Sequence, residues 1–480
     1  MTGQAAIALL PLLVLAGAVV LVLLAIGLHR SHVLTASLTL AGLTASFAML
    51  PVSAGARARQ VTPLFVLDGF ALLYIGLILA AALLVAALSW TYLERQAGQR
   101  EEFYVLLLLA TLGSAGLAAS AHLASFFLSL EVLSVSLYAL IAFPRASRRS
   151  AEAGLKYLVL AAASAAFLLF GMALVYAAAG TMEIAALASA VGRAAGPDAL
   201  LLLTGIGMLV IGIGYKLAVA PFHLWIPDVY EGAPAPTGAF VATVSKGSVF
   251  AVLLRLYMGI GIHEGHGALF TVFAILAVAS MVMGNLLALL QDNVKRILAY
   301  SSVAHLGYLL VAPLAGGALA ITAATFYLAA YFVTMLGAFG VIAVLSDGER
   351  DADRMEDLRG LFARRPWLAV VLTGMLLSLA GIPLTAGFIG KFYLVASGAG
   401  VALWWLILVL VVTSVIGLFY YLRIVVAVYS DPEQALDARP PAPAMAMPGA
   451  IALAALALLL VWLGVYPSPL IALIRSCIGV

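Results

Sequence analysis

The sequence predicts an all-α, polytopic membrane protein, and three observations indicate this fold class. First, 65% of the 480 residues are hydrophobic, 9% are charged and the mean hydropathy is +1.17, values that no soluble globular domain approaches. Second, apolar stretches long enough to cross a bilayer follow one another along nearly the whole chain. Third, two of these stretches contain proline and glycine, as interrupted transmembrane helices do.

The apolar stretches predict about 14 transmembrane helices, because one crossing takes about 20 mainly apolar residues. We expect these helices at residues 5–28, 33–50, 68–93, 102–120, 122–142, 152–179, 199–227, 235–258, 267–290, 296–314, 318–346, 366–397, 402–429 and 446–466. No basic residue precedes the first stretch, which is too long for a signal-peptide core. We therefore expect it to remain as a transmembrane helix.

Basic residues orient the predicted helices, because cytoplasmic connections are enriched in Lys and Arg. Connections after odd-numbered helices hold Arg30, Arg95, Arg100, Arg145, Arg148, Arg149, Lys295, Arg350, Arg354, Arg359, Arg364 and Arg365. Connections after even-numbered helices hold Arg57, Arg59 and Arg193. The odd-numbered connections are therefore predicted to be cytoplasmic, and both termini are predicted on the outer, periplasmic side.

Two predicted helices are interrupted near residues that carry charge. The seventh contains Pro221 and His223, and the twelfth contains Pro383 and Gly387. Proline removes a backbone donor and glycine loosens the chain, so both helices are predicted to unwind briefly. Backbone unwound at membrane depth is tolerated only beside protein or a water-filled cavity. His223 is then either a water-path residue or a hydrogen-bond partner for the loosened backbone.

The two interrupted helices lie five helices apart, which is a pattern of inverted structural repeats. Helices 4–8 and 9–13 are therefore expected to be related units of a single integral membrane domain, residues 1–480, although no residue-level identity joins them. In this division residues 1–101 hold helices 1–3, residues 102–258 and 267–429 hold the two units, and residues 446–480 hold helix 14 and the tail.

The chain has five lysines, and four of them lie inside predicted helices: Lys156, Lys216, Lys246 and Lys391. Only Lys295 stands at the edge of a segment. A lysine at the bilayer centre costs about 2.5–3.5 kcal/mol on insertion scales, which indicates a functional role. Lysine, unlike arginine, can lose its proton when it is desolvated. The four lysines therefore predict a proton path through a membrane.

Other titratable side chains complete this predicted path. Glu131 lies near the middle of the fifth helix, and we expect it to pair with Lys216, since an isolated buried carboxylate needs a cation. Near Lys246, water is expected on neighbouring hydroxyl groups, those of Thr243, Ser245 and Ser248. His305 can relay protons in either direction, and Lys391 would end the row.

Each of these residues also has a purely structural interpretation. Lys156 and Lys391 could extend their ammonium groups to the membrane surface. Glu131 and Lys216 could form a static ion pair, and His305 could be a hydrogen-bonded core histidine.

Long stretches of the sequence resemble one family. They are LEVLSVSLYAL, AEAGLKYLVLAAASAAFLLFG, GYKLAVAPFHLWIPDVYEGAPAPTGAFVATVSKGSVFA, NVKRILAYSSVAHLGYLL and LAGIPLTAGFIGKFYL. These stretches resemble the antiporter-like membrane subunits of bacterial NADH:quinone oxidoreductase (respiratory complex I), and among them the subunit N family. The resemblance covers most of residues 120–400.

The resemblance implies a fourteen-helix subunit with broken helices 7 and 12 and one proton channel. The family's channel residues correspond here to Glu131, Lys156, Lys216, Lys246, His305 and Lys391. The resemblance also implies a non-redox subunit of a proton-translocating enzyme in the bacterial cytoplasmic (inner) membrane. No cofactor is then expected in this chain, while FMN, iron–sulfur clusters and quinone are expected in partner subunits. The expected partners are the other membrane and peripheral subunits and the lipid bilayer, and no nucleic acid.

Related subunits remain as alternatives. Subunit L carries a long lateral C-terminal helix, whereas this sequence stops soon after its fourteenth predicted helix. Subunit M has a glutamate at the position of Lys391. Antiporter subunits of the multi-subunit sodium/proton type share much of the pattern and are the main alternative.

Two other classes of protein are alternatives, a haem-binding electron carrier and a purely structural membrane anchor. The single cysteine, Cys477, excludes a disulfide framework and a cysteine-ligated cluster within this chain. A haem-binding electron carrier would need paired axial ligands, but His122, His223 and His305 are spread over three segments. A purely structural membrane anchor would tolerate neutral replacements of the buried charges.

Overall fold

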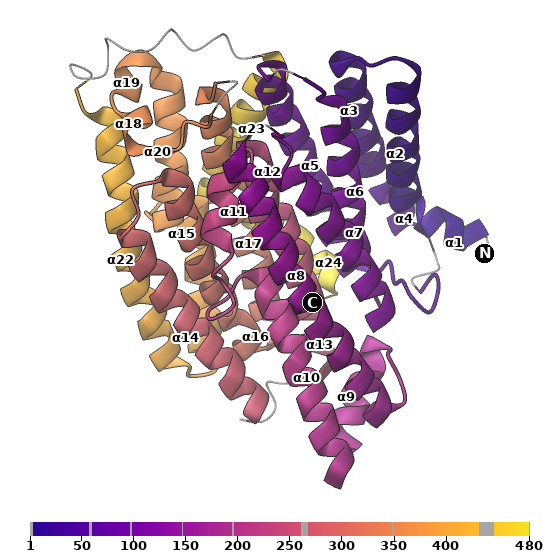
Figure 1. Cartoon of the computed structure of the whole chain (residues 1–480). Coiled ribbons are helices and arrows are strands. Elements are labelled where there is room, and N and C mark those ends of the chain that lie inside the picture. The colour runs from indigo at the N-terminus through magenta and orange to yellow at the C-terminus, as the bar shows by residue number, and fades with distance from the viewer. Residues whose placement is uncertain are drawn as a thin grey trace.

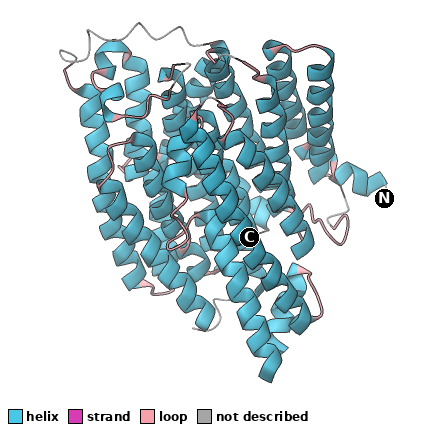
Figure 2. Ribbon diagram, in the orientation of Figure 1, coloured by secondary structure: helices cyan, strands magenta, loops and turns pink. Residues whose placement is uncertain are grey.

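The computed structural model describes residues 3–56, 60–96, 98–145, 147–193, 196–260, 267–347, 350–431 and 446–479. Figure 1 shows a bundle of long, mostly upright helices, and Figure 2 shows that loops join them. The described residues contain no strand. The predicted all-α class is therefore confirmed.

The N-terminal helices form one side of the bundle (Figure 1). They are α1 (Gly3–Ala8), α2 (Leu10–Leu28), α3 (His32–Ala48), α4 (Leu50–Ala54) and α5 (Gly69–Glu94). Asp68 caps the start of α5, where its side chain accepts from the Ala71 amide at 2.8 Å. The same carboxylate accepts two hydrogen bonds of 2.9 Å from Arg255, far along the chain. Burial opposes ionisation, but Arg255 still holds the pKa of Asp68 below its usual value.

The next part of the chain carries the first interruption. Its helices are α6 (Glu101–Ala118), α7 (Leu123–Ile141), α8 (Arg148–Ala179), α9 (Ile184–Arg193), α10 (Gly196–Leu217), α11 (Ile226–Gly232), α12 (Ala235–Phe240), the π-helical turn η1 (Val241–Ser245) and α13 (Lys246–Ile260).

The remaining helices carry the second interruption. They are α14 (Ala268–Leu289), α15 (Val294–Leu309), α16 (Val311–Ala315), α17 (Gly317–Leu345), α18 (Met355–Leu358), α19 (Leu361–Arg364), α20 (Pro366–Ala380), α21 (Ala386–Ala399), α22 (Trp404–Tyr429), α23 (Met447–Val465) and α24 (Ser468–Ile478). The division of the bundle into two repeats stays a prediction.

The number of crossings agrees with the prediction. Thirteen helices of the described residues are long and apolar enough to cross a membrane. The predicted crossing 366–397 is divided between α20 and α21, each of which is too short alone. Figure 1 places the α2–α3 connection, α18 and α19 at one end of the bundle and α9 at the other.

The seventh crossing is interrupted after α10, where Pro221 lies in the turn that leads to α11. Side chains bond the backbone groups that this break exposes. The Ala220 amide donates to Ser280 Oγ at 2.9 Å, and the Trp225 indole donates to the Tyr215 carbonyl at 3.0 Å. The break therefore meets protein groups, as unwound backbone at membrane depth requires.

The twelfth crossing is interrupted between α20 and α21, where Gly381 (φ 87°) and Leu384 (φ 71°) have left-handed backbones. Pro383 lies between these two residues. Gly387 lets α21 pass close to the end of α20, because a Cβ atom there would stand 1.9 Å from the Ser378 carbonyl oxygen. Both interruptions predicted from proline and glycine are confirmed.

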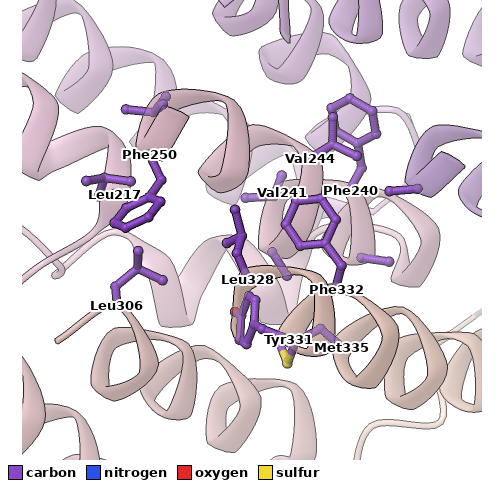
Figure 3. Close-up of a cluster of buried hydrophobic side chains, with 14 of the residues drawn as sticks. Leu217, Phe240, Val241, Val244, Phe250, Leu306, Leu328, Tyr331, Phe332 and Met335 are labelled. Atoms are coloured by element: carbon purple, nitrogen blue, oxygen red, sulfur yellow. The ribbon is translucent and has the colours of Figure 1, made fainter. Parts of the chain in front are cut away.

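Three crossings form the buried centre: Ala235–Met258, Val294–Ala315 and Gly317–Leu345. Figure 3 shows apolar side chains of these crossings packed against one another, among them Val244, Phe250, Leu306 and Phe332. The same crossings carry Lys246 and His305. The predicted titratable row therefore passes through the core of the bundle.

Candidate functional site

Lys246 is the most deeply buried of the predicted residues, with 0% of its surface exposed. It begins α13 directly after the π-helical turn η1, and such turns often occur at functional sites. Its ammonium donates a hydrogen bond to Ser302 Oγ of α15 and lies 5.7 Å from the centre of the Tyr230 ring.

The hydroxyl groups expected to hold water beside Lys246 are placed differently. Thr243 and Ser248 donate to carbonyl groups of their own helical segment. Each hydroxyl oxygen can still accept a hydrogen bond, so its role in holding water stays a prediction. The hydroxyl that contacts Lys246 is that of Ser302.

Lys216 lies in the last turn of α10 and is 4% exposed. Its ammonium donates to Ser134 Oγ of α7 at 2.6 Å and lies 5.4 Å from the centre of the Tyr157 ring. Glu131 is on α7 three residues before Ser134, and one of its carboxylate oxygens, Oε1, is buried without a hydrogen-bond partner. Ser134 therefore bonds the Lys216 ammonium directly, whereas Glu131, the predicted partner, interacts with it through charge and not through a direct ion pair.

His305 is bonded at both ring nitrogens. Nδ1 lies 2.6 Å from the Tyr327 hydroxyl of α17, and Nε2 lies 3.1 Å from the Tyr421 hydroxyl of α22. The ring is 3% exposed. This geometry agrees with a hydrogen-bonded core histidine and equally with a proton relay.

Lys391 ends the row at the second interruption. Its ammonium donates to the carbonyls of Leu379 and Ala380 at 3.0 and 2.9 Å and to Ser414 Oγ at 2.7 Å. An ammonium has three donors, so all of them are used. The two carbonyls end α20, where a cation is favoured by the helix dipole. Lys391 is 8% exposed and directed at the break, so the surface position considered above is wrong.

Lys156 is not part of this buried row. Its side chain is 44% exposed and pairs with Glu152 of its own helix at 2.7 Å and with Asp228 of α11 at 2.8 Å. Arg296 also pairs with Asp228, at 2.8 Å. Burial tends to raise the pKa of Asp228, but Lys156 and Arg296 together hold it below its usual value. The structure therefore corrects the placement of Lys156 in the path.

Replacing Lys156 by Gln is expected to change proton transport by less than about twofold, because exposed ion pairs contribute only about 0–1 kcal/mol. Arg296 would still neutralise Asp228. The measurement is proton uptake by vesicles that hold the assembled protein, with Lys216→Gln as the matched buried variant. Equal losses of proton uptake in Lys156→Gln and Lys216→Gln would show that Lys156 is part of the proton path.

His223 lies just after the first interruption and is 3% exposed. Neither ring nitrogen has a hydrogen-bond partner, and the nearest described aromatic ring contact is with Tyr300 at 6.3 Å. Its ring interacts with the Pro221 backbone at the break, so both predicted roles, backbone partner and water-path residue, stay predictions. Trp225 and Ser280 bond other backbone groups of the same break.

Lys295, at the N-terminal edge of α15, is buried as well, with 1% exposed. It pairs with Asp351 at 2.7 Å and donates to the Ala233 carbonyl at 2.8 Å. Lys295 and Asp351 border a cavity of about 1170 Å³ that is lined by positively and negatively charged side chains. Asp353 also borders this cavity, and burial raises its pKa.

The partners of the buried row were not found from the sequence. Ser134 stands three residues from Glu131, so helical spacing could have found it. Ser302, Tyr327, Ser414 and Tyr421 approach from distant helices, and no local pattern marks them. Among the described residues no group of three or more His, Cys, Asp or Glu could hold a metal ion.

The fold and this row define a class: polytopic antiporter-like membrane proteins with lysines buried beside two broken helices. The chain belongs to the family described as NADH:quinone oxidoreductase/Mrp antiporter, TM, which matches residues 120–417. The resemblance found in the sequence is thereby confirmed.

Individual relatives agree with this assignment. A protein of Ectopseudomonas mendocina (strain ymp) named NADH-quinone oxidoreductase subunit N is 49% identical over 99% of this chain and 97% of its own. A chain of respiratory complex I from Thermus thermophilus with bound aureothin has a TM-score of 0.83 at 35% identity, over 96% of this chain and 98% of its own. A chain of the Mrp complex from Dietzia sp. DQ12-45-1b has a TM-score of 0.87 over 99% and 97%, and at 23% identity it shows the fold alone.

Proposed function

We propose that this chain is a proton-translocating membrane subunit of an NADH:quinone oxidoreductase. The observation that carries the proposal is the series of buried amines in the bundle centre, each bonded to a serine hydroxyl of another helix: Lys216 to Ser134, Lys246 to Ser302 and Lys391 to Ser414. Buried lysines of this kind mark ion pathways. The 49% identity to a relative named subunit N supports the same assignment.

In this proposal the chain does no redox chemistry. NADH oxidation and quinone reduction belong to partner subunits, which would hold the FMN, the iron–sulfur clusters and the quinone. The protein would sit in the bacterial inner membrane among the other membrane and peripheral subunits. The concentration of Arg in odd-numbered connections supports placing both termini on the outer side.

The three lysines are held by different numbers of hydrogen-bond acceptors. Lys216 and Lys246 each donate to one described hydroxyl, whereas Lys391 donates to three acceptors at a helix end. A proton that reaches Lys391, the last lysine of the row, would leave toward the outside or continue along the row.

Glu131 supplies a means of control. It stands one helical turn from Ser134, which binds Lys216, and its buried Oε1 atom has no hydrogen-bond partner. A signal from a partner subunit that changes the charge of Glu131 would alter how strongly Lys216 holds its proton. Moving one charge against the membrane potential costs about 2.3 kcal/mol per 100 mV, while one pKa unit corresponds to about 1.36 kcal/mol. A shift of a few pKa units covers this cost.

Replacing Lys216 by Ala is expected to abolish coupled proton pumping while the complex still assembles. The measurement is acidification of proteoliposomes during NADH oxidation. NADH oxidation by a soluble artificial acceptor serves as the control for intact partner subunits. Normal pumping by Lys216→Ala would contradict the assignment of this chain as a proton-translocating subunit.

A subunit of a multi-subunit cation/proton antiporter is the second candidate, supported by the shared fold of the Mrp chain. It predicts sodium-dependent proton transport in vesicles without NADH-oxidising partners. Transport that depends on NADH oxidation and ignores sodium would reject it.

A further inference from the structure

His305 is held between tyrosine hydroxyls that come from two different helices. Tyr327 of α17 bonds Nδ1 at 2.6 Å, and Tyr421 of α22 bonds Nε2 at 3.1 Å. Both tyrosines are 1% exposed. A neutral imidazole has one N–H donor and one acceptor nitrogen. One hydroxyl must therefore donate to the ring while the other accepts from it.

Tyr421 joins His305 to the part of the row near Lys246. Its hydroxyl bonds both His305 Nε2 and Ser301 Oγ. Ser301 directly precedes Ser302, the residue that accepts from Lys246. The Tyr421 side of the ring is therefore the side toward Lys246.

Tyr327 lies on the side toward Lys391. Its ring packs on α21 at Gly390, where a Cβ atom would come within 2.5 Å of Tyr327 Cδ2. Gly390 directly precedes Lys391 in the chain. The two nitrogens of His305 thus face opposite ends of the row.

We propose that Ser301, Tyr421, His305 and Tyr327 form a hydroxyl–imidazole relay in which Tyr421 and Tyr327 are proton-carrying residues. This inference rests on the proposed function and adds α22 to the path. Tyr421 gives its hydroxyl proton to Nε2 and takes one from Ser301, and Ser301 takes in turn the proton that the Lys246 ammonium releases. The imidazolium gives its Nδ1 proton to the Tyr327 oxygen, and the original Tyr327 proton moves on toward Lys391. Each oxygen gains and loses one proton, so one positive charge crosses the ring without a redox step.

The relay must also return to its starting state. After one transfer the ring carries its proton on the other nitrogen. A half-turn of the ring about its Cβ–Cγ bond exchanges the two nitrogens, and rotation of the Tyr421 and Tyr327 hydroxyl groups then restores the starting hydrogen bonds. The rings of Tyr308, Tyr327 and Tyr331 surround the imidazole, with centres within 5.8 Å of its own.

Two neighbouring tyrosines do not share this geometry. Tyr420, beside Tyr421 in the chain, donates to Asn285 Oδ1 at 3.0 Å. Tyr331 places its ring centre 5.4 Å from that of His305, but its hydroxyl bonds neither ring nitrogen. A tyrosine can therefore lie near His305 without a hydrogen bond to either ring nitrogen, and variants can distinguish these two properties.

The test uses the purified complex in proteoliposomes with Tyr421→Phe. We expect proton pumping to fall on the order of 100-fold, the usual contribution of a positioned proton-transfer group, with normal assembly. Tyr74→Phe is the control, because it removes a buried hydroxyl that is bonded to Thr325 at 3.1 Å and lies outside the row. It is expected to pump normally. Normal pumping by Tyr421→Phe would overturn the relay.

A second variant keeps the hydroxyl and separates relay from packing. With 3-fluorotyrosine at position 421, pumping is expected to recover, and its alkaline limb is expected to move to lower pH because the hydroxyl is more acidic. A purely packing role predicts recovery with an unchanged pH profile, which would contradict the relay. If Tyr421→Phe fails to assemble, this pH profile decides the question alone.

Lys246→Ala, measured in parallel, distinguishes the two proposals. Lost pumping in Lys246→Ala with normal pumping in Tyr421→Phe rejects the relay and keeps the proposed function. Normal pumping in both variants rejects the proposed function itself.

Discussion

Replacing Lys246 by Ala is expected to abolish proton pumping by the assembled complex. Lys246 is fully buried at the centre of the row and is the only lysine in its crossing. Without its amine the proton would have to pass through apolar core, where an isolated charge costs many kcal/mol. The measurement is the rate of proteoliposome acidification during NADH oxidation, compared at equal content of this subunit.

Ser248→Ala is the matched control. Ser248 is fully buried two residues later, and its hydroxyl donates only to the Ser245 carbonyl. This variant removes a buried polar group from the same helix without touching the row. Pumping is expected to stay near the wild-type rate. Equal losses in Lys246→Ala and Ser248→Ala would point to damage in the helix rather than to a lost proton site.

Replacing Gly387 by Ala is expected to prevent stable folding of the subunit. The added methyl group would stand 1.9 Å from the Ser378 carbonyl oxygen and 2.8 Å from its carbon. Because these are backbone atoms, α20 and α21 would have to separate. We expect this to cost about 3 kcal/mol or more in stability, the upper end of the effect of overpacking. The separation would also pull Lys391 from the carbonyls at the end of α20.

The amount of subunit in purified membranes and its resistance to heat measure this effect. Gly374→Ala is the control within α20, because its methyl group would meet only the end of the Leu460 side chain, at 3.2 Å. That side chain can move, so near-normal yield is expected. Normal yield and stability of Gly387→Ala would show that the close approach of the two half-helices is not required.

The transmembrane crossings could be predicted because each helix must be apolar along its own stretch of sequence. A bilayer imposes a run of apolar residues on each helix, and proline and glycine mark a break within a run. Pro221 and Gly387 therefore indicated the interruptions without any tertiary information. The short helices α9, in a connection, and α24, after the last crossing, were not predicted, since no membrane length applies to either.

The candidate site could be predicted less completely. Burial of Lys216, Lys246 and Lys391 followed from their places in apolar runs. Their partners did not, because each partner depends on which distant helices meet. For this reason the sequence did not indicate that Ser134, on the same helix as Glu131, would bond the Lys216 amine directly. Lys156 also occupies an apolar run, but its face of α8 is exposed and meets Asp228.

The most direct test of a titrating lysine row is proton pumping by Lys246→Arg in the assembled complex. Arginine keeps the positive charge and much of the length of lysine, but it does not release its proton in proteins. If protons pass through the amine itself, acidification of the proteoliposomes should be lost, as in Lys246→Ala. If Lys246→Arg pumps at the wild-type rate, a fixed charge suffices at this position and the proton does not pass through residue 246.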